Sequence, residues 1–391
     1  MNNLKYEKFH DAITSDISSN KYSTHTLSGL KYHIIHLISI FFTTQSFCKV
    51  KQISRKKFYF VDNKNSIVKK IVDKDNKHFS LLLKGGVKNF ISFNPSLFFL
   101  DLYYDALYRW KRQGSGLYKI ILNLFYKPIL KRNIQNIVGL NLVVSQDYQG
   151  APYVLKFLNP HLSFQLIGFQ HGLLNLNPNH VDLFPCSSLR KNIIFHACLK
   201  KSMRKISHSR LYGPKSFHCK NEIQDSTKSN EVVFISSGHI EFCYNYLAVF
   251  KKIFNELNIL FTIRLHPHES RFKNKIRDNL NINIDSNKET LLNKKHNIVF
   301  MGIYSTLLFE AAISGFKVVF IPPCEDLIED GGFKLQKDEL DMINKLPNTE
   351  LLDNINSESF MEILRKPLYR YNSDSYIQDL SSFFFKVIQN D

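Results

Sequence analysis

The sequence predicts an α/β protein built from two Rossmann-like domains. Short, continuous apolar and β-branched runs alternate with segments of helical period, which is typical of parallel strands covered on both faces. The chain has 391 residues, a length that suits two domains or one large one. Hydrophobic residues make up 44% and charged residues 22% of it. This composition provides a sizeable core and excludes disorder of the whole chain.

The second half of the chain shows the alternation most clearly. The expected strands are 231–237, 260–265, 281–285, 297–301 and 317–322, and the expected helices are 242–257 and 306–314.

The first half repeats the pattern more faintly, with expected strands at 79–83, 140–145 and 164–168 and expected helices at 101–112 and 117–135. Residues 215–230 are polar and lack an apolar period, so they are interpreted as a linker. The expected organisation is a first domain over 1–214, the linker 215–230, a second domain over 231–375 and a C-terminal helix over 376–391. Two such domains would face a central cleft, and we expect the last helix to pack back across their junction.

Lys and Arg number 52 against 34 Asp and Glu, which gives a formal net charge of +18. An excess of this size favours a polyanionic partner, namely nucleic acid, an anionic membrane face or a phosphate-bearing substrate. The six cysteines are scattered without a CxxC pair, and no apolar run reaches the roughly 20 residues that span a bilayer. We therefore expect a cytoplasmic protein. The basic segment 117–132 is either a core-facing helix with a solvated face or a contact with the inner face of the membrane.

Polar residues follow the expected strands of the second domain, where open α/β sheets bind ligands. Ser236, Ser237 and Gly238 form a small-residue turn before a helix, which either caps that helix or lets backbone N–H groups approach a phosphate. His266 and Pro267 end the next strand. There the imidazole could donate to a phosphate oxygen and offset charge on a leaving group, although a lone His-Pro is more often turn chemistry.

Ser305 and Thr306 begin the helix after the fourth strand, as plain caps or as phosphate ligands. Glu310, one turn further on, is either a solvated helix residue or an acceptor for ribose hydroxyl groups.

In the first domain, Gln170, His171 and Gly172 end a strand, and Asp147 follows the preceding one. His171 and Asp147 are the candidate general bases, and Gln170 and Gly172 are assigned to the acceptor side. The Asp73-Lys74-Asp75 sequence is interpreted as a charged turn, so no metal site is expected.

Taken together, Gln170-His171-Gly172, His266-Pro267 and Ser305-Thr306 with Glu310 resemble a superfamily of bacterial surface-polysaccharide transferases with the GT-B fold. The superfamily includes capsule Kdo transferases, sialyl- and pseudaminyltransferases and teichoic acid glycerophosphotransferases. The resemblance implies that His266, Ser305 and Thr306 hold the phosphate of a cytidine nucleotide donor and that His171 lies near the reacting centre. Glycerophosphotransferases carry Trp-His-Gly where this chain has Gln-His-Gly, which favours the capsule glycosyltransferases.

The leading hypothesis is a metal-independent GT-B glycosyltransferase without a cofactor. It would move a 2-keto acid sugar, such as Kdo, sialic or pseudaminic acid, from its CMP ester onto a lipid-linked or oligosaccharide acceptor of a capsule or O-antigen. Its catalytic residues would be His171, Asp147 and His266. One alternative is transfer of a polyol phosphate from a CDP donor. The other is a non-catalytic nucleic-acid-binding protein, for which Lys51–Lys57 followed by Phe58, Tyr59 and Phe60 offers basic residues beside aromatic ones.

Overall fold

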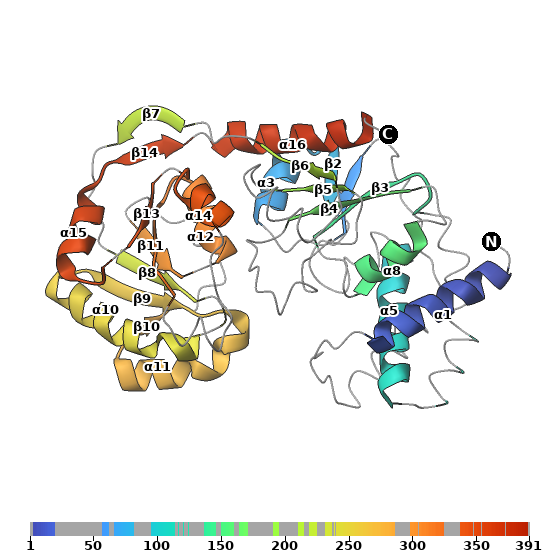
Figure 1. The fold of residues 1–391 in the computed structure, drawn as a ribbon, viewed down its shortest axis with the longest axis horizontal. Coiled ribbons are helices and arrows are strands. Elements are labelled where there is room, and N and C mark those ends of the chain that lie inside the picture. Colours follow the sequence, from blue (N-terminus) through green and yellow to red (C-terminus); the bar gives the residue numbers. More distant parts are fainter. Residues whose placement is uncertain are drawn as a thin grey trace. The chain divides into compact units, whose positions relative to one another are not determined.

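The computed structural model of the chain contains two compact α/β units, each built on a six-stranded sheet (Figure 1). It describes residues 3–19, 57–61, 66–81, 95–113, 116, 120, 124, 137–145, 150–159, 164–170, 191–194, 210–214, 219–224, 231–236, 238, 240–285, 298–303, 305–323, 337–346, 348–352, 354–371 and 373–389. The predicted fold class, α/β with two Rossmann-like domains, is confirmed. The expectations about a central cleft and about helix packing across the junction stay predictions.

The first sheet runs in the order β2-β1-β3-β4-β5-β6. Its strands are β1 (Phe58–Phe60), β2 (Phe79–Leu81), β3 (Asn141–Val144), β4 (Gln165–Phe169), β5 (Lys191–Ile193) and β6 (Arg210–Tyr212). The pairings from β2 through β5 are all parallel. The helices described in this part are α1 (Asn3–Ser19), α3 (Ser66–Lys74), α5 (Pro95–Gln113) and α8 (Gly150–Leu158). Of the helix expected at 117–135, only residues 120 and 124 are described.

Strand β1 lies between β2 and β3, second from the edge of this sheet, and was not predicted. Alternate residues of a strand point to opposite faces, and here Tyr59 packs with helices α1, α5 and α8 while Phe58 and Phe60 do not belong to that cluster. Phe58 stacks on Phe79 with ring centroids 5.3 Å apart, and Phe60 meets Phe169 edge-on at 5.9 Å. All three aromatic side chains of β1 are buried. They are core residues, so the interpretation of Phe58, Tyr59 and Phe60 as a stacking surface for nucleic acid is wrong.

The second sheet runs in the order β10-β9-β8-β11-β12-β13, and every pairing in it is parallel. Its strands are β8 (Glu231–Ile235), β9 (Leu260–Arg264), β10 (Asn283–Ile284), β11 (Ile298–Gly302), β12 (Lys317–Phe320) and β13 (Thr349–Leu351). All five strands predicted in this half are therefore present.

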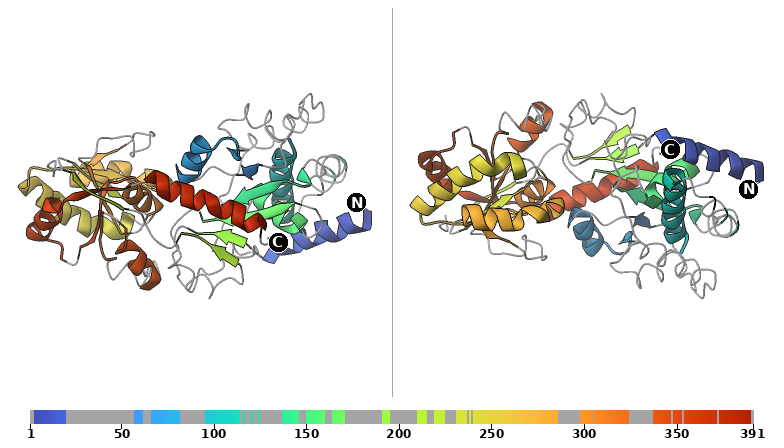
Figure 2. Two further views of the ribbon diagram at one scale, coloured as in Figure 1. Left: turned by 90° about the horizontal axis from the view of Figure 1, so that it is seen from above. Right: turned by 90° about the horizontal axis from the view of Figure 1, so that it is seen from below.

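The helical elements of the second unit follow its strands in turn. They are η6 (Ile240–Cys243), α10 (Tyr244–Glu256), η7 (Pro267–Phe272), α11 (Lys273–Leu280), α12 (Thr306–Ile313), α14 (Lys337–Ile343), α15 (Ser357–Arg365) and α16 (Ser373–Gln389). Helices α10 and α11 lie side by side on one face of the sheet (Figure 2). Helix α12 lies on the other face (Figure 1).

Within the range expected as a linker, Cys219–Gln224 forms strand β7, which pairs antiparallel with β14 (Leu368–Tyr371). Among the described residues, no helix has the length and apolarity that a membrane crossing requires.

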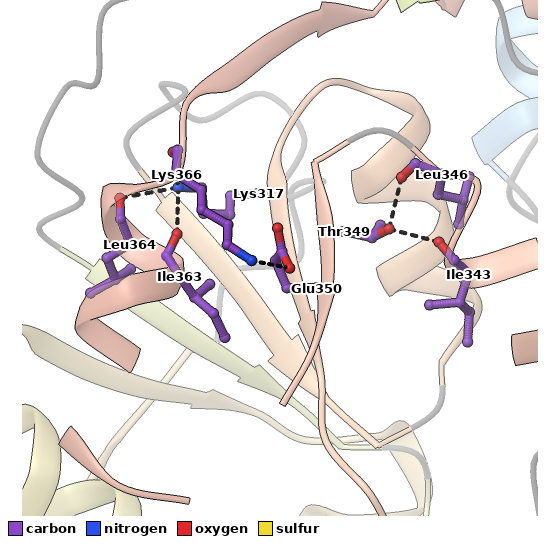
Figure 3. A network of polar contacts seen from close by, with 8 residues as sticks. All are labelled: Lys317, Ile343, Leu346, Thr349, Glu350, Ile363, Leu364 and Lys366. Carbon is purple, nitrogen blue, oxygen red and sulfur yellow. Dashed lines mark hydrogen bonds and ion pairs between the residues drawn. The ribbon is translucent and has the colours of Figure 1, made fainter. Parts of the chain in front are cut away.

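Lys317, the first residue of β12, is 3% exposed and caps the end of helix α15 (Figure 3). Its Nζ donates to the carbonyl oxygens of Ile363, Leu364 and Lys366 at 2.9, 3.1 and 2.6 Å. The last carbonyls of a helix lack the usual N–H partner one turn further on, and the amino group satisfies them here; the carbonyl of Ile363 also accepts from the N–H of Lys366 at 3.2 Å. Burial lowers the pKa of Lys317 to about 8. Since Lys317 lies at the amino end of its strand, the shifted pKa belongs to a structural cap and not to a site at the opposite edge.

Candidate functional site

The candidate site lies at the carboxyl edge of the second sheet, where the strand order reverses. Numbered along the chain, its six strands lie in the order 3-2-1-4-5-6, so β8 and β11 are the neighbours between which the connections diverge. In open α/β sheets the ligand crevice lies at this switch point, outside the carboxyl ends of the strands. Gly302, the last residue of β11, lies close to β8. A Cβ atom there would be 2.6 Å from the carbonyl oxygen of Ile235 and 3.1 Å from Cδ1 of Leu308.

The loops after β8 and β9 meet beside His266. Gly238 has a φ of +99°, a backbone conformation that favours glycine, and a Cβ atom on it would lie 3.9 Å from Nδ1 of His266. The imidazole of His266 is half-buried. Gly238 from the first loop thus lies beside His266 from the second, and Ser236 begins the first loop at the end of β8.

The carboxylate of Glu269 joins these two loops. Its Oε1 accepts a hydrogen bond from the backbone N–H of Ile240 at 2.6 Å, and its Oε2 accepts one from the N–H of His266 at 2.8 Å. The residue is 2% exposed. Because Ile240 is the first residue of η6, the carboxylate binds the N–H group at this helix start, and that group is not open to a phosphate.

Ser236 follows the last residue of β8 and is 5% exposed. Its backbone N–H donates to the carbonyl of Arg264 at 3.0 Å. Its Oγ has no hydrogen-bond partner within the described part of the chain. A buried hydroxyl without a partner is costly unless a ligand or water satisfies it, so Ser236 is a candidate ligand-binding group at the switch point.

Helix α12 begins at the end of β11 with a polar turn. Ser305 is its N-cap, and its Oγ accepts from the N–H of Leu307 at 3.3 Å. Ser305 and Thr306 are both half-buried. The helix start therefore combines a capping hydroxyl with a second hydroxyl beside it, an arrangement that favours an anion.

Glu310, one turn into α12, is only 7% exposed. Its interpretation as a solvated helix residue is therefore wrong, whereas its interpretation as an acceptor for a ribose hydroxyl group stays a prediction.

The remaining predicted site residues are described partly or not at all. Gln170 is buried at the end of β4, where its N–H donates to the carbonyl of Ile193 at 2.9 Å. The backbone of Pro267 begins η7. Four predicted positions lie outside the described residues: Asp147, His171, Gly172 and Ser237. Within the part of the chain that is described, no group of three or more His, Cys, Asp or Glu side chains could hold a metal ion. Asp73 and Lys74 end helix α3, so the interpretation of these two residues as a turn is wrong. Asp75, directly after the helix, bonds to Nδ1 of His78, at 2.8 Å from its Oδ2.

No role was predicted for Glu269 from the sequence, although the residues before it indicate a helix cap. His266, Pro267 and Glu269 occupy the N-cap, the first and the third positions of η7. Proline is common at the first helical position, and a glutamate at the third position reaches back to the N-cap N–H in a capping box. The His-Pro-x-Glu spacing therefore predicts the bond to His266, but it does not predict the second bond to the other loop.

No protein-family model matches the chain, and no curated protein does. Among solved structures, it is similar to UDP-GlcNAc 2-epimerase of Methanocaldococcus jannaschii in complex with UDP-GlcNAc and UDP, at 12% identity and a TM-score of 0.46 over 86% of this chain and 99% of that one. A UDP-N-acetylglucosamine 2-epimerase from Rickettsia bellii matches at 9% identity and a TM-score of 0.45, over 85% of this chain and 95% of that one.

An Anabaena protein, HepE, in complex with UDP and glucose, matches at 10% identity and a TM-score of 0.45, over 85% of this chain and 94% of that one. Identities this low say nothing of this chain's substrate.

Proposed function

We propose that the protein is a glycosyltransferase that binds a nucleotide-linked sugar at the carboxyl edge of the second sheet. One observation carries the proposal, namely that polar groups from three strand ends gather at the switch point of a single parallel sheet. They are the buried Ser236 hydroxyl after β8, the His266 imidazole after β9 and the hydroxyl-bearing start of α12 after β11. Hydroxyl groups, an imidazole and a helix start are all suited to an anion such as a nucleotide phosphate.

In the reaction, an acceptor hydroxyl oxygen attacks the anomeric carbon of the sugar as the bond from that carbon to the phosphate oxygen breaks. The proton of the acceptor goes to a base, for which His171 and Asp147 are the candidates. The leaving phosphate gains negative charge, which His266, Ser305 and Thr306 would offset. No metal ion takes part in this scheme.

The finer assignment comes from the resemblance of the strand-end motifs to bacterial surface-polysaccharide transferases. On that basis, the donor is a CMP-linked 2-keto acid sugar and the acceptor is a lipid-linked or oligosaccharide chain of a capsule or O-antigen. The formal net charge of +18 suits an anionic acceptor and contact with the inner face of an anionic membrane.

A thermal-shift screen against CMP, CDP, UDP and GDP tests the donor, because a ligand that binds only the folded state raises its apparent stability. CMP is expected to raise the melting temperature, and His266→Ala is expected to diminish the effect while the protein stays folded. A shift with UDP or GDP alone would overturn the cytidine assignment.

Product analysis tests the transfer itself. A glycosidic bond formed with release of CMP agrees with the proposal. A phosphodiester formed from a CDP donor would show polyol-phosphate transfer instead.

A further inference from the structure

The buried carboxylate of Glu269 connects two loops that both border the candidate phosphate site. One oxygen accepts from Ile240 in the loop after β8 and the other from His266 in the loop after β9, at 2.6 and 2.8 Å. The backbone N–H of Glu269 also donates to the carbonyl of His266 at 2.8 Å, which closes the turn. The His266 loop is thus held at its own turn and, through the buried side chain of Glu269, against the neighbouring loop.

The two hydrogen bonds to the carboxylate of Glu269 are stronger than hydrogen bonds between neutral groups. A carboxylate that accepts from backbone N–H groups makes charge-assisted hydrogen bonds, about twice as strong as neutral ones. A residue that is 2% exposed has little access to water that could replace either bond. Opening one loop would leave a buried carboxylate oxygen without a partner, which is costly.

We propose that Glu269 is a positioning residue for nucleotide binding, fixing the backbone of His266 relative to the loop that carries Ser236 and Gly238. This inference rests on the proposed function, because it takes the nucleotide phosphate as the group that His266 meets. Glu269 acts through His266 and does not itself touch the nucleotide. A close approach supports the coupling, since a Cβ atom on Gly238 would lie only 3.9 Å from the imidazole.

The direction in which Glu269→Gln changes the affinity for CMP distinguishes a positioning role from a purely electrostatic one. Glu269→Gln removes a negative charge near the candidate anion site, so a purely electrostatic role predicts tighter binding of CMP. A positioning role predicts weaker binding, because the amide group has a single acceptor oxygen and leaves one backbone N–H without its partner. The two roles therefore move the dissociation constant in opposite directions.

The experiment measures CMP binding by calorimetry to the parent protein and to four variants: Glu269→Gln, His266→Ala, the two changes combined, and Glu241→Gln. Glu269→Gln is expected to weaken binding about ten-fold. In a His266→Ala background the same change is expected to have less than about a two-fold effect, because residues that act through one another are not additive. Glu241→Gln is the matched control. Its carboxylate belongs to η6 and pairs with Arg271 at 3.8 Å on the surface, so its loss is expected to leave binding unchanged.

Amide hydrogen exchange supplies a readout that does not depend on the nucleotide. Glu269→Gln is expected to speed exchange at Ile240 and His266, whereas Glu241→Gln is not. Unchanged exchange at these two amides would overturn the connection itself. Tighter CMP binding, or equal effects in the presence and absence of His266, would overturn the positioning role.

Should the parent protein bind none of the four nucleotides, the proposed function and the role in binding fail together, while the exchange result still decides whether the loops are joined. If Glu269→Gln does not fold, Glu269→Asp replaces it. The shorter side chain keeps the charge but cannot reach both loops, so weaker binding and faster exchange are again expected. If Glu269→Asp binds CMP and exchanges its amide hydrogens as the parent protein does, the proposal is overturned.

Discussion

Gly302 and Ile235 lie so close together that a Cβ atom on Gly302 would be 2.6 Å from the carbonyl oxygen of Ile235. The two residues end β11 and β8, the strands between which the order of the second sheet reverses. Only a residue without a side chain allows this approach, so Gly302 sets the separation of the two strands where the candidate site begins.

Replacement of Gly302 by alanine is therefore expected to force β8 and β11 apart at their carboxyl ends. The predicted loss in the free energy of unfolding is about 1–3 kcal/mol, the usual cost of overpacking. Denaturant unfolding measures it. Gly116→Ala is the control, since no atom of the described residues, apart from the adjoining backbone, lies within 4 Å of the position that its Cβ would take. If the two variants are equally stable, β8 and β11 can move apart without a loss in the free energy of unfolding, and the prediction is wrong.

Two N-cap substitutions separate helix capping from ligand binding. Ser305→Ala removes the cap of α12 and Asn356→Ala removes that of α15, where Oδ1 accepts from the N–H of Ser359 at 2.8 Å. Each is expected to lower the free energy of unfolding by about 1 kcal/mol. Only Ser305→Ala is expected to weaken CMP binding, measured by calorimetry on both variants. If the two variants bind CMP equally, Ser305 is a cap and nothing more.

Glu310 is expected to bind the ribose of the nucleotide. The parent protein should bind CMP about ten-fold more tightly than 2′,3′-dideoxy-CMP, because a buried acceptor would lose its donor with the deoxy ligand. In Glu310→Ala this ratio should fall to about one. The ratio is taken within each variant, so general damage to the site cancels. An undiminished ratio in the variant would assign ribose recognition to another residue.

Lys317 predicts a pH dependence of stability. Its pKa is about 8 in the folded protein against 10.5 for an ordinary lysine, so between these values the unfolded chain holds a proton that the folded chain has lost. Stability rises with pH wherever the unfolded state binds more protons. The contribution of Lys317 to the free energy of unfolding should thus increase from pH 8 to 10.5 and be flat below pH 8. Denaturant unfolding of the parent and of Lys317→Met across this pH range measures the contribution. If the free energies of unfolding of the two proteins change with pH in parallel, the prediction is wrong.

The sequence predicted the second sheet well because its strands are continuous apolar runs, a pattern that few other structures share. It missed β1 because this strand has three residues and directly follows a run of basic residues, so Phe58–Phe60 was taken for an exposed aromatic segment. It also missed α11, whose single buried residue, Ile276, leaves no apolar period to detect.

The candidate site was predicted as a set of strand ends, because parallel strands deliver their carboxyl ends to one edge. The sequence could not show that Glu310 is buried, that the hydroxyl of Ser236 lacks a partner among the described residues or that Glu269 reaches a second loop. Each of these depends on what another segment brings close to the residue. The contact between Gly302 and Ile235 is of the same kind, since it joins residues 67 positions apart in the chain (302 − 235).

The carboxylate of Glu269 accepts from the first N–H of η6. At this helix start the protein supplies its own anion, so an incoming phosphate would be recognised here by side chains and not by that backbone group. Backbone groups are the same in every sequence, whereas an imidazole or a hydroxyl group can be exchanged by one codon change. A scaffold of this kind can acquire a new donor preference by point mutation while its main chain stays as it is.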